Sequence, residues 1–355
     1  MLRKIILTGG GTAGHITPNL ALLPYLKEAD FDVAYIGSMD SIESRLIPGA
    51  GIPFTGIATG KLRRYFSLKN FTDPFRVLRG ISQAKKRMKE YQPDIVFSKG
   101  GYVGLPVAVA AKLLKIPVIL HESDMTPGLA NRLCLPFAKM ICCNFPETVR
   151  SLPKKKAVLT GSPIRDEIRY GDKKRGLTFC HFHEGKPVIL VMGGSSGAAA
   201  INFVVRKALP ELLNDFQIVH LCGKGKLDES LFGKEGYIQF EYITDDLKDL
   251  FAMADLVISR AGANSICELL ALKKPNLLIP LSRGSRGDQI LNAASFEAQG
   301  YSSVVAEKDL TKEILIEKVT ELYCSRQTYI DAMGKSAQMN ANKAIVDLIQ
   351  KEIKD

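Results

Sequence analysis

Short apolar runs alternate with amphipathic segments along the first half of the chain. The apolar runs are residues 4–7, 33–36, 95–98, 118–121, 140–143 and 158–160. The segments with helical periodicity are residues 18–28, 41–46, 67–91, 105–114 and 126–133. Because buried strands separated by helices are typical of βαβ units, this alternation predicts a parallel, doubly wound sheet.

The second half repeats the same scheme. Its apolar runs are residues 187–192, 217–221, 238–242, 256–259, 276–280 and 302–305, and residues 310–355 have a helical pattern. A chain of 355 residues has room for two domains. We therefore expect an α/β protein with two Rossmann-like domains whose parallel sheets face a cleft. The first comprises residues 1–160 and a C-terminal helix at about 337–355, which packs back onto it; the second comprises residues 161–336.

A glycine-rich turn follows the first apolar run, with Gly9, Gly10, Gly11 and Gly14 inside six residues. It matches Gly-x-Gly-x-x-Gly, but a dinucleotide site also needs an acidic residue at the end of the second strand. Asp32 and Asp40 lie before and beyond that position, which disfavours NAD or FAD. A glycine turn that opens a helix still suits an anionic or strongly polar ligand.

His15 stands at the mouth of this turn, where an imidazole can take part in proton transfer. It can equally cap the helix or hydrogen-bond to the loop, and the stretch alone does not separate these roles. Two other polar loops, residues 99–102 and 121–124, also follow predicted strands. Ligands of doubly wound sheets bind beyond the carboxyl ends of the strands, so we expect the three loops on one rim.

The second half carries its own polar loops. The turn from Gly193 to Ala198 opens a helix and adds serine hydroxyls to a backbone suited to phosphates. Glu268 follows the turn at Gly262, where it can bind the hydroxyls of a ribose or merely compensate the helix dipole. Further residues of the types that read sugar hydroxyls are Asp288, Gln289 and Asn292, although Asp288 can also cap a helix.

Charge and cysteine usage narrow the class of protein. The net charge of +11 is carried by residues 1–160, which hold 23 Lys and Arg against 11 Asp and Glu. Such a basic half fits nucleic acid, anionic lipid or a phosphorylated substrate, or a solvated basic surface. Seven scattered cysteines without Cys-x-x-Cys indicate reduced thiols in a cytoplasmic protein. We see neither a signal peptide nor an uninterrupted apolar span.

One basic segment also carries an apolar stripe. Phe71, Phe75 and Leu78 are spaced by three or four residues among Arg76, Arg79 and several lysines. An apolar stripe beside basic residues is typical of a helix at a membrane surface. The alternative is an ordinary amphipathic helix packed on the sheet.

Taken together, these loops resemble the MurG family, the GT-B glycosyltransferases that convert lipid I to lipid II in peptidoglycan synthesis. Seven blocks match in family order over nearly the whole chain. They are residues 9–15, 100–102, 121–124 with 127–131, 161–165, 193–198, 259–262 with Glu268, and 288–289 with Asn292. The resemblance implies a hexosyltransferase that moves N-acetylglucosamine from UDP-N-acetylglucosamine (UDP-GlcNAc) to the 4-hydroxyl of the muramyl residue of lipid I, with inversion.

The resemblance also implies a role for each site residue. The donor would be held by the uracil contact Thr244, the ribose contact Glu268, the diphosphate contacts Ser195 and Arg165, and the sugar contacts Ala263, Asp288, Gln289 and Asn292. The loop with Gly10, Gly11, Thr12 and Gly14 would face the acceptor diphosphate, and Thr12 and Gly14 would also reach the donor. His15, Tyr102 and Asp124 would flank the acceptor hydroxyl.

Some positions depart from the family pattern. Position 124 is Asn in many members, and an Asp can act as a base where Asn cannot, so His15 and Asp124 compete for that role. Asp288 stands where many members have Gln, and Ser162 where many have Asn. Asp30-Phe31-Asp32 matches a metal-binding Asp-x-Asp, but it precedes a strand, away from the expected rim. We expect no cofactor and no required metal.

The implied partners are UDP-GlcNAc, lipid I and an anionic membrane surface contacted by Phe71, Phe75 and Leu78. We expect a peripheral protein on the cytoplasmic face of the cell membrane, in a cell-wall synthesis or division complex. Three alternatives stay open: a UDP-GlcNAc epimerase of the same fold, a transferase acting on another lipid, and a nucleic-acid-binding protein. The last lacks a recognisable DNA or RNA module, and we expect no nucleic-acid partner.

Overall fold

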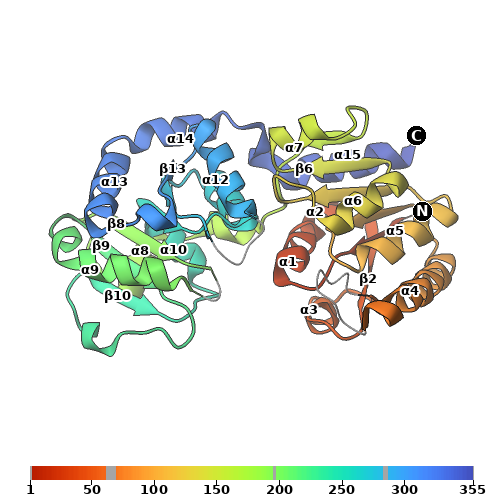
Figure 1. Cartoon of the computed structure of the whole chain (residues 1–355), viewed down its shortest axis with the longest axis horizontal. Coiled ribbons are helices and arrows are strands. Elements are labelled where there is room, and N and C mark those ends of the chain that lie inside the picture. Colours follow the sequence, from red (N-terminus) through yellow and green to blue (C-terminus); the bar gives the residue numbers. More distant parts are fainter. Residues whose placement is uncertain (1, 61–68, 195–196, 283–286, 355) are drawn as a thin grey trace. The chain divides into compact units, whose positions relative to one another are not determined.

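The computed structural model describes residues 2–60, 69–194, 197–282 and 287–354, and only the backbone of Ala13, residues 69–72 and Lys354. The chain divides into two compact units (Figure 1). Unit 1 comprises Met1–Arg165 and Asn340–Asp355, and unit 2 comprises Asp166–Met339. These boundaries lie a few residues beyond those expected from the sequence.

Unit 1 is built on a seven-stranded sheet in the order β3-β2-β1-β4-β5-β6-β7, and every neighbouring pair is parallel. The strands are β1 (Arg3–Thr8), β2 (Phe31–Ser38), β3 (Phe54–Ile57), β4 (Ile95–Ser98), β5 (Val118–Glu122), β6 (Met140–Cys143) and β7 (Ala157–Leu159). The strand order reverses between β1 and β4, which makes this the ligand-binding position of a doubly wound sheet.

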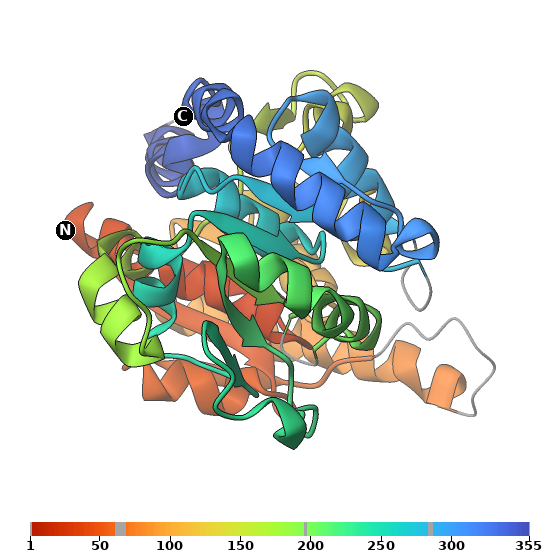
Figure 2. The same ribbon diagram turned by 90° about the vertical axis from the view of Figure 1, so that its left-hand side faces the viewer.

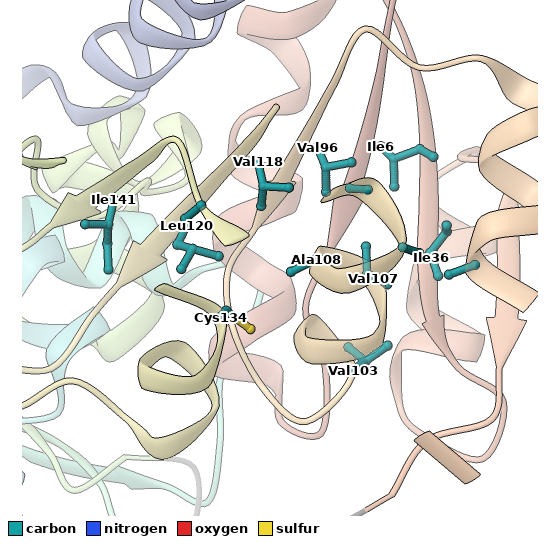
Figure 3. Close-up of a cluster of buried hydrophobic side chains, with 14 of the residues drawn as sticks. Ile6, Ile36, Val96, Val103, Val107, Ala108, Val118, Leu120, Cys134 and Ile141 are labelled. Atoms are coloured by element: carbon teal, nitrogen blue, oxygen red, sulfur yellow. The ribbon is translucent and has the colours of Figure 1, made fainter. Parts of the chain in front are cut away.

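Alternate residues of each strand enter two different cores, which is why the runs are apolar throughout. On one face, Ile6, Val96 and Leu120 meet α5 and Cys134 of α6 (Figure 3). On the other, Ile5 and its counterparts meet residues of α1, α2 and α15. The helices of this unit are α1 (Ala13–Ala21), α2 (Leu23–Glu28), α3 (Glu43–Gly49), α4 (Lys69–Tyr91), α5 (Gly104–Leu113), α6 (Leu129–Cys134), η1 (Leu135–Phe137), α7 (Pro146–Ser151) and α15 (Ala341–Lys354).

Unit 2 has a six-stranded parallel sheet in the order β10-β9-β8-β11-β12-β13. The strands are β8 (Val188–Met192), β9 (Gln217–Leu221), β10 (Tyr237–Phe240), β11 (Leu256–Ser259), β12 (Asn276–Leu278) and β13 (Ser303–Val304). Here the order reverses between β8 and β11. The two sheets confirm the predicted pair of Rossmann-like units.

The helices of unit 2 pack around this sheet. One core joins β8, β9 and β11 to α9 and α13, which lie side by side (Figure 2). Side-chain caps fix the start of α8, where Asp172 accepts from Lys174 N at 2.7 Å, and of α13, where Thr311 accepts from Ile314 N at 3.3 Å. The helices are η2 (Asp166–Tyr170), α8 (Lys173–Cys180), α9 (Ala199–Asp215), η3 (Glu229–Leu231), α10 (Leu247–Met253), α11 (Ala263–Ala271), α12 (Asp288–Ala298), η4 (Glu307–Asp309), α13 (Lys312–Cys324), α14 (Arg326–Gly334) and η5 (Ala337–Asn340), whose last residue belongs to unit 1.

Some elements differ from the sequence-based expectation, among them α1, α2 and β3. The helix predicted at residues 18–28 is two helices, and the first begins at Ala13, so Pro18 lies inside α1 instead of opening it. The short strand β3 was not predicted, because Gly56 interrupts its apolar pattern.

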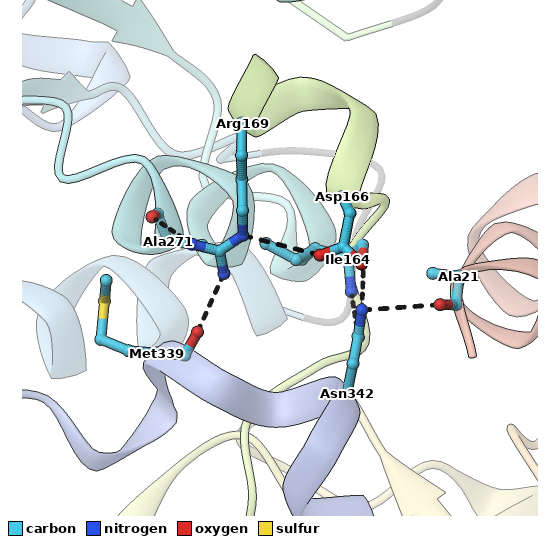
Figure 4. Close-up of polar contacts among 7 residues, drawn as sticks. All are labelled: Ala21, Ile164, Asp166, Arg169, Ala271, Met339 and Asn342. Carbon is cyan, nitrogen blue, oxygen red and sulfur yellow. Dashed lines mark hydrogen bonds and ion pairs between the residues drawn. The ribbon is translucent and has the colours of Figure 1, made fainter. Parts of the chain in front are cut away.

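Polar contacts fasten the chain where it passes between the units (Figure 4). In unit 1, Asn342 of α15 accepts from Ile164 N at 3.0 Å and donates to Ile164 O at 2.8 Å. In unit 2, Arg169 donates to the carbonyls of Ala271 at 3.1 Å and Met339 at 2.9 Å. Each crossing segment is therefore held by the unit to which it belongs.

Two further features concern the length and hydropathy of the helices and the state of the cysteines. In the part of the chain that the structure describes, no helix is both long and apolar enough to cross a membrane. The seven cysteines are free thiols; six are buried, and burial raises the pKa of Cys134 and Cys142 to about 12.

Candidate active site

The glycine loop of unit 1 follows β1, and side chains of neighbouring elements hydrogen-bond to its backbone. Tyr35 donates its hydroxyl to Gly9 O at 2.6 Å, and Asn19 donates to Thr8 O at 3.1 Å. The fully buried carboxylate of Glu43 accepts from Gly11 N at 3.3 Å, from Ser38 N at 3.1 Å and from the hydroxyl of Ser41. Glu43 therefore fixes the backbone of the loop, a role that no pattern in the sequence signalled.

His15 lies in the first turn of α1, just beyond this loop. Its Nδ1 is 3.0 Å from Gly10 O and 3.2 Å from Thr12 Oγ1. A carbonyl oxygen only accepts, so Nδ1 carries the proton, and in the neutral ring Nε2 carries the lone pair. The loop hydrogen bond considered from the sequence is present, and it selects the tautomer in which Nε2 can act as a base.

The three polar loops of unit 1 meet on one rim, as predicted. A Cβ added to Gly11 would lie 2.6 Å from the Tyr102 ring, and one added to Gly101 would lie 2.3 Å from Gly10 O. The glycines thus let the loops after β1 and β4 touch. The sequence-predicted residues Gly10, Gly11 and Tyr102 are brought together here. Thr12 precedes α1 and is exposed, whereas Gly14 lies inside α1 and is half-buried.

The loop after β5 is anchored by Glu122. Its carboxylate accepts from Asn131 Nδ2 at 2.8 Å, Gly128 N at 2.9 Å and Asp124 N at 3.1 Å. Burial raises the pKa of Glu122, while these hydrogen bonds oppose the shift. The backbone of Asp124, the rival candidate base, is therefore held in place.

Arg165 is the last residue of this part of unit 1. It directly follows Ile164, whose backbone is hydrogen-bonded to Asn342. It is half-buried, and its Nε has no hydrogen-bond partner among the described residues. A buried N–H of this kind is costly unless something accepts from it. This fits the predicted contact with a phosphate, which stays a prediction.

In unit 2 the glycine turn after β8 is equally tight. A Cβ on Gly197, whose φ is +66°, would lie 1.9 Å from Cys222 O, and one on Gly193 would lie 2.4 Å from Ala198 N. Only glycine fits at these two positions, and the turn leads into the N-terminus of α9. Ser195, the predicted diphosphate contact, lies outside the described residues.

The loop after β11 leads into α11. Ala263 is the first residue of that helix, where backbone N–H groups point outward, and Glu268 lies half-buried in its second turn. Arg260, only 9% exposed, donates to Ile279 O at 3.0 Å and pairs with Glu307. Glu307 in turn accepts from Ser282, so Arg260 ties together the loops after β11 and β12.

The remaining residues predicted to bind the sugar donor lie on α12 and in the turn between β10 and α10. Gln289 accepts from Leu281 N at 3.0 Å, and the fully buried Asn292 donates to Ala261 O at 3.2 Å. These amides join α12 to the neighbouring loops. Asp288 opens α12 and is half-buried, and Thr244 is exposed in the turn before α10. Their predicted roles toward the sugar and uracil stay predictions.

The two rims offer different chemistry. Unit 1 combines the imidazole of His15, a glycine loop and the carboxylate of Asp124 in the loop after β5, a set suited to moving a proton beside a polar substrate. Unit 2 combines two loops that open helices, which suit phosphates, with polar side chains for hydroxyl groups. Sequence reasoning missed the roles of Glu43, Lys99 and Arg260. The only signal for Lys99 and Arg260 was a charged residue directly after a strand, and Glu43 had none.

The predicted membrane stripe lies on α4. Phe75 and Leu78 are 73% and 63% exposed, and Arg76 and Arg79 beside them are exposed as well. The opposite side of the helix packs Ala84 and Met88 into the core. The side chain of Phe71 lies outside the described residues.

Comparisons with known proteins identify the family. Residues 5–143 match the glycosyltransferase family 28 N-terminal domain, and residues 188–349 match the family 28 C-terminal domain. A protein from Lachnospira eligens, named "UDP-N-acetylglucosamine--N-acetylmuramyl-(pentapeptide) pyrophosphoryl-undecaprenol N-acetylglucosamine transferase", is 62% identical over 98% of this chain and 99% of its own length.

Solved structures agree. The crystal structure of Acinetobacter baumannii MurG covers 98% of this chain and 99% of its own, with 28% identity and a TM-score of 0.78. A putative UDP-N-acetylglucosamine 2-epimerase from Listeria monocytogenes has a TM-score of 0.70 at 13% identity, covers 100% of this chain and 97% of its own, and so shares the fold alone. The chain belongs to glycosyltransferase family 28 and, within it, to the MurG family of N-acetylglucosamine transferases.

Proposed function

We propose that this chain transfers N-acetylglucosamine from UDP-GlcNAc to the muramyl 4-hydroxyl of lipid I, giving lipid II. The observation that carries the proposal is the 62% identity, over almost the full length of both chains, to a transferase named for this reaction. An epimerase on the same fold is less well supported, because that likeness rests on 13% identity.

The geometry of His15 supports the proton step. The acceptor hydroxyl gives its proton to His15 Nε2 as its oxygen attacks the anomeric carbon. The bond from that carbon to the diphosphate breaks, UDP leaves with the electron pair, and the configuration inverts. Because Gly10 O holds Nδ1–H, the basic lone pair is set on Nε2 before substrate arrives. Tyr102 and Asp124 line the same rim and position the acceptor.

The donor is held by residues of unit 2 and by Arg165, the last residue of unit 1 before the chain enters unit 2. Backbone N–H groups of the 193–198 turn and the start of α11, together with Ser195 and Arg165, stabilise the leaving diphosphate. Glu268 accepts from the ribose hydroxyls, Thr244 meets the uracil, and Ala263, Asp288, Gln289 and Asn292 surround the sugar. This arrangement works without a metal or cofactor, and full turnover in excess EDTA is the expected result.

The decisive assay follows labelled sugar from UDP-GlcNAc to a short-chain lipid I analogue. Wild type transfers the label; His15→Ala loses at least about 100-fold in kcat, the size typical of a lost general base. His183→Ala, an exposed histidine of unit 2, serves as the control and keeps wild-type turnover. Wild-type epimerisation of the donor without transfer would refute the function. Normal turnover in His15→Ala, with loss in Asp124→Ala, would move the base to Asp124.

The lipid acceptor brings the protein to a membrane surface, and we place Phe75 and Leu78 at that contact. Basic side chains attract anionic lipid and apolar ones enter the interface. Together with the homologues' lipid substrate, this supports a peripheral position on the cytoplasmic face of the cell membrane, within reach of cell-wall synthesis proteins.

Sedimentation with vesicles tests this contact. Phe75→Asp with Leu78→Asp should lower binding to phosphatidylglycerol vesicles by about 10-fold or more, because two apolar side chains no longer leave water. Phe232→Asp, which changes another exposed phenylalanine, in unit 2, should leave binding intact. Equal binding by all three proteins would exclude the α4 surface.

A further inference from the structure

Lys99 is a buried lysine at the point where the strand order of unit 1 reverses. It directly follows β4, and its backbone N–H donates to Thr8 O at 2.8 Å, beside the start of the glycine loop. Only 1% of the residue is exposed. Burying an ammonium group costs free energy unless it is hydrogen-bonded, so its acceptors matter.

The end of β5, the loop after it and the segment after β7 each supply one acceptor to this ammonium group. Lys99 Nζ lies 2.9 Å from His121 Nδ1, donates to the hydroxyl of Ser123, and is 3.4 Å from Ser162 Oγ. His121 lies at the end of β5, Ser123 in the loop after it, and Ser162 in the segment after β7. An ammonium group has three donors, which matches this set.

His121 extends this bridge, by which the ammonium group of Lys99 connects the segments. Its Nε2 donates to Gly161 O at 2.9 Å, since a carbonyl only accepts, and Nδ1 therefore accepts from Lys99. Burial and the adjacent ammonium lower the pKa of His121 well below its usual range, so the ring stays neutral. Lys99 and His121 thus connect the end of β4 to residues 161–162 by two routes.

Each bridged loop carries one candidate site residue. Tyr102 is three residues after Lys99, Asp124 follows Ser123, and Arg165 is three residues after Ser162. The Lys99 Cβ also lies 3.1 Å from the position of a Cβ on Gly9, so the side chain packs against the first residue of the glycine loop. Removing the ammonium would release three segments of the rim together.

We propose that Lys99 is a positioning residue for glycosyl transfer: its ammonium group holds the loops that carry Tyr102, Asp124 and Arg165 in their reactive arrangement. The catalytic part of this inference rests on the proposed function, whereas the bridging of the loops does not.

The first test compares Lys99→Met with Lys156→Met. Methionine keeps an unbranched side chain without the charge. Lys156 is the matched control, because its ammonium also joins chain segments, at Leu135 O and Ala138 O, before β7 and so at the other end of the strands. Lys99→Met should lose about 10- to 100-fold in kcat, since displacements of about 1 Å cost this much. The kcat of Lys156→Met should stay at the wild-type value.

Hydrogen exchange tests the bridge independently of turnover. Amides at residues 100–104, 123–128 and 161–165 should exchange faster together in Lys99→Met and remain unchanged in Lys156→Met. If wild type does not transfer sugar to lipid I, the proposed function fails, while this measurement still decides whether Lys99 holds the loops.

A double-mutant cycle separates positioning from general stability. If Lys99 acts through the loop after β5, adding Ser123→Ala to Lys99→Met should lower kcat no further than Lys99→Met alone. Fully additive losses, unchanged exchange in the three loops, or a lowered Tm with wild-type kcat in the folded protein would each overturn the proposal.

Discussion

At the scale of single residues, His220 shows how a buried polar group is specified in unit 2. Its Nδ1 lies 3.0 Å from the Tyr237 hydroxyl, and its Nε2 lies 3.0 Å from Asn202 Oδ1. Asn202 donates its own amide to Cys222 O at 2.9 Å, so Oδ1 faces the histidine and Nε2 carries the proton. Burial and the nearby Arg206 lower the pKa of His220 to about 3.

This shift predicts a stability loss in mild acid. Below pH 6.5 the unfolded chain binds a proton at His220 that the folded chain refuses until about pH 3. The free energy of unfolding therefore falls by about 1.4 kcal/mol per pH unit in this window, or roughly 2 kcal/mol by pH 5. Urea unfolding between pH 7.5 and 5 measures the slope for unit 2.

Two variants check the origin of this slope. His220→Gln keeps a group that can donate to Asn202. It should lower the pH dependence of the free energy of unfolding by the contribution of about one proton. His181→Ala, at an exposed residue, should retain the wild-type pH dependence. An unchanged slope in His220→Gln would contradict the assignment. His121 adds the same effect in unit 1, because its pKa is also lowered.

At the scale of elements, close approach decides how α4 lies on its sheet. A Cβ on Gly80 would lie 2.1 Å from Ala58 O, directly after β3. The contact is to backbone, which cannot move aside as a flexible side chain would. Gly80 therefore sets the distance between α4, which carries the exposed Phe75 and Leu78, and the edge of the sheet.

Gly80→Ala should destabilise unit 1 by a few kcal/mol. The sign of this stability change identifies the steric effect, because Gly→Ala in an unhindered helix stabilises the protein by about 1 kcal/mol. Gly49→Ala is the control: it also lies in a helix, and no atom lies within 4 Å of its added Cβ. Thermal unfolding of both variants measures the difference. A Tm for Gly80→Ala at or above that of wild type would exclude the steric role.

Elements with strong periodicity were predictable from the sequence. Strands buried on both faces, such as β4 and β11, match their predicted bounds because their apolar runs need no tertiary information. The start of α1 was wrong, because a proline was taken to open a helix that accommodates Pro18 in its interior. The glycine loops and His15 were recognisable, since their chemistry is local. The burial of Lys99 and Glu43 was not, because it depends on loops distant in sequence.

At the scale of the whole molecule, unit 1 is discontinuous. The chain leaves it after Arg165 and returns at Asn340. The returning helix α15 places Ile345, Val346 and Ile349 in the same core as β1 and β2, with each side chain at most 5% exposed. Unit 2 is continuous from Asp166 to Met339.

This connectivity predicts unequal fragments. Residues 166–339 should fold alone, whereas residues 1–165 should not, since three lost apolar contacts at roughly 1.5–3 kcal/mol each approach the total stability of a domain. A fusion of 1–165 to 340–355 through a short Gly/Ser linker should restore cooperative unfolding in circular dichroism, because Asn342 bonds directly to Ile164. Cooperative unfolding of 1–165 without the fusion would contradict the expectation.

The late return of α15 also sets the order of events during synthesis on the ribosome. Most of the amino-terminal unit is translated first, yet its last helix is made only after the whole of unit 2. Unit 2 emerges whole and can fold while translation continues, contrary to the usual order in which the first-made domain folds first. Until α15 has been made, the face of β1 and β2 that it covers is open to solvent. The nascent protein therefore carries an exposed apolar surface, of the kind that chaperones bind, for the whole time taken to make its second half.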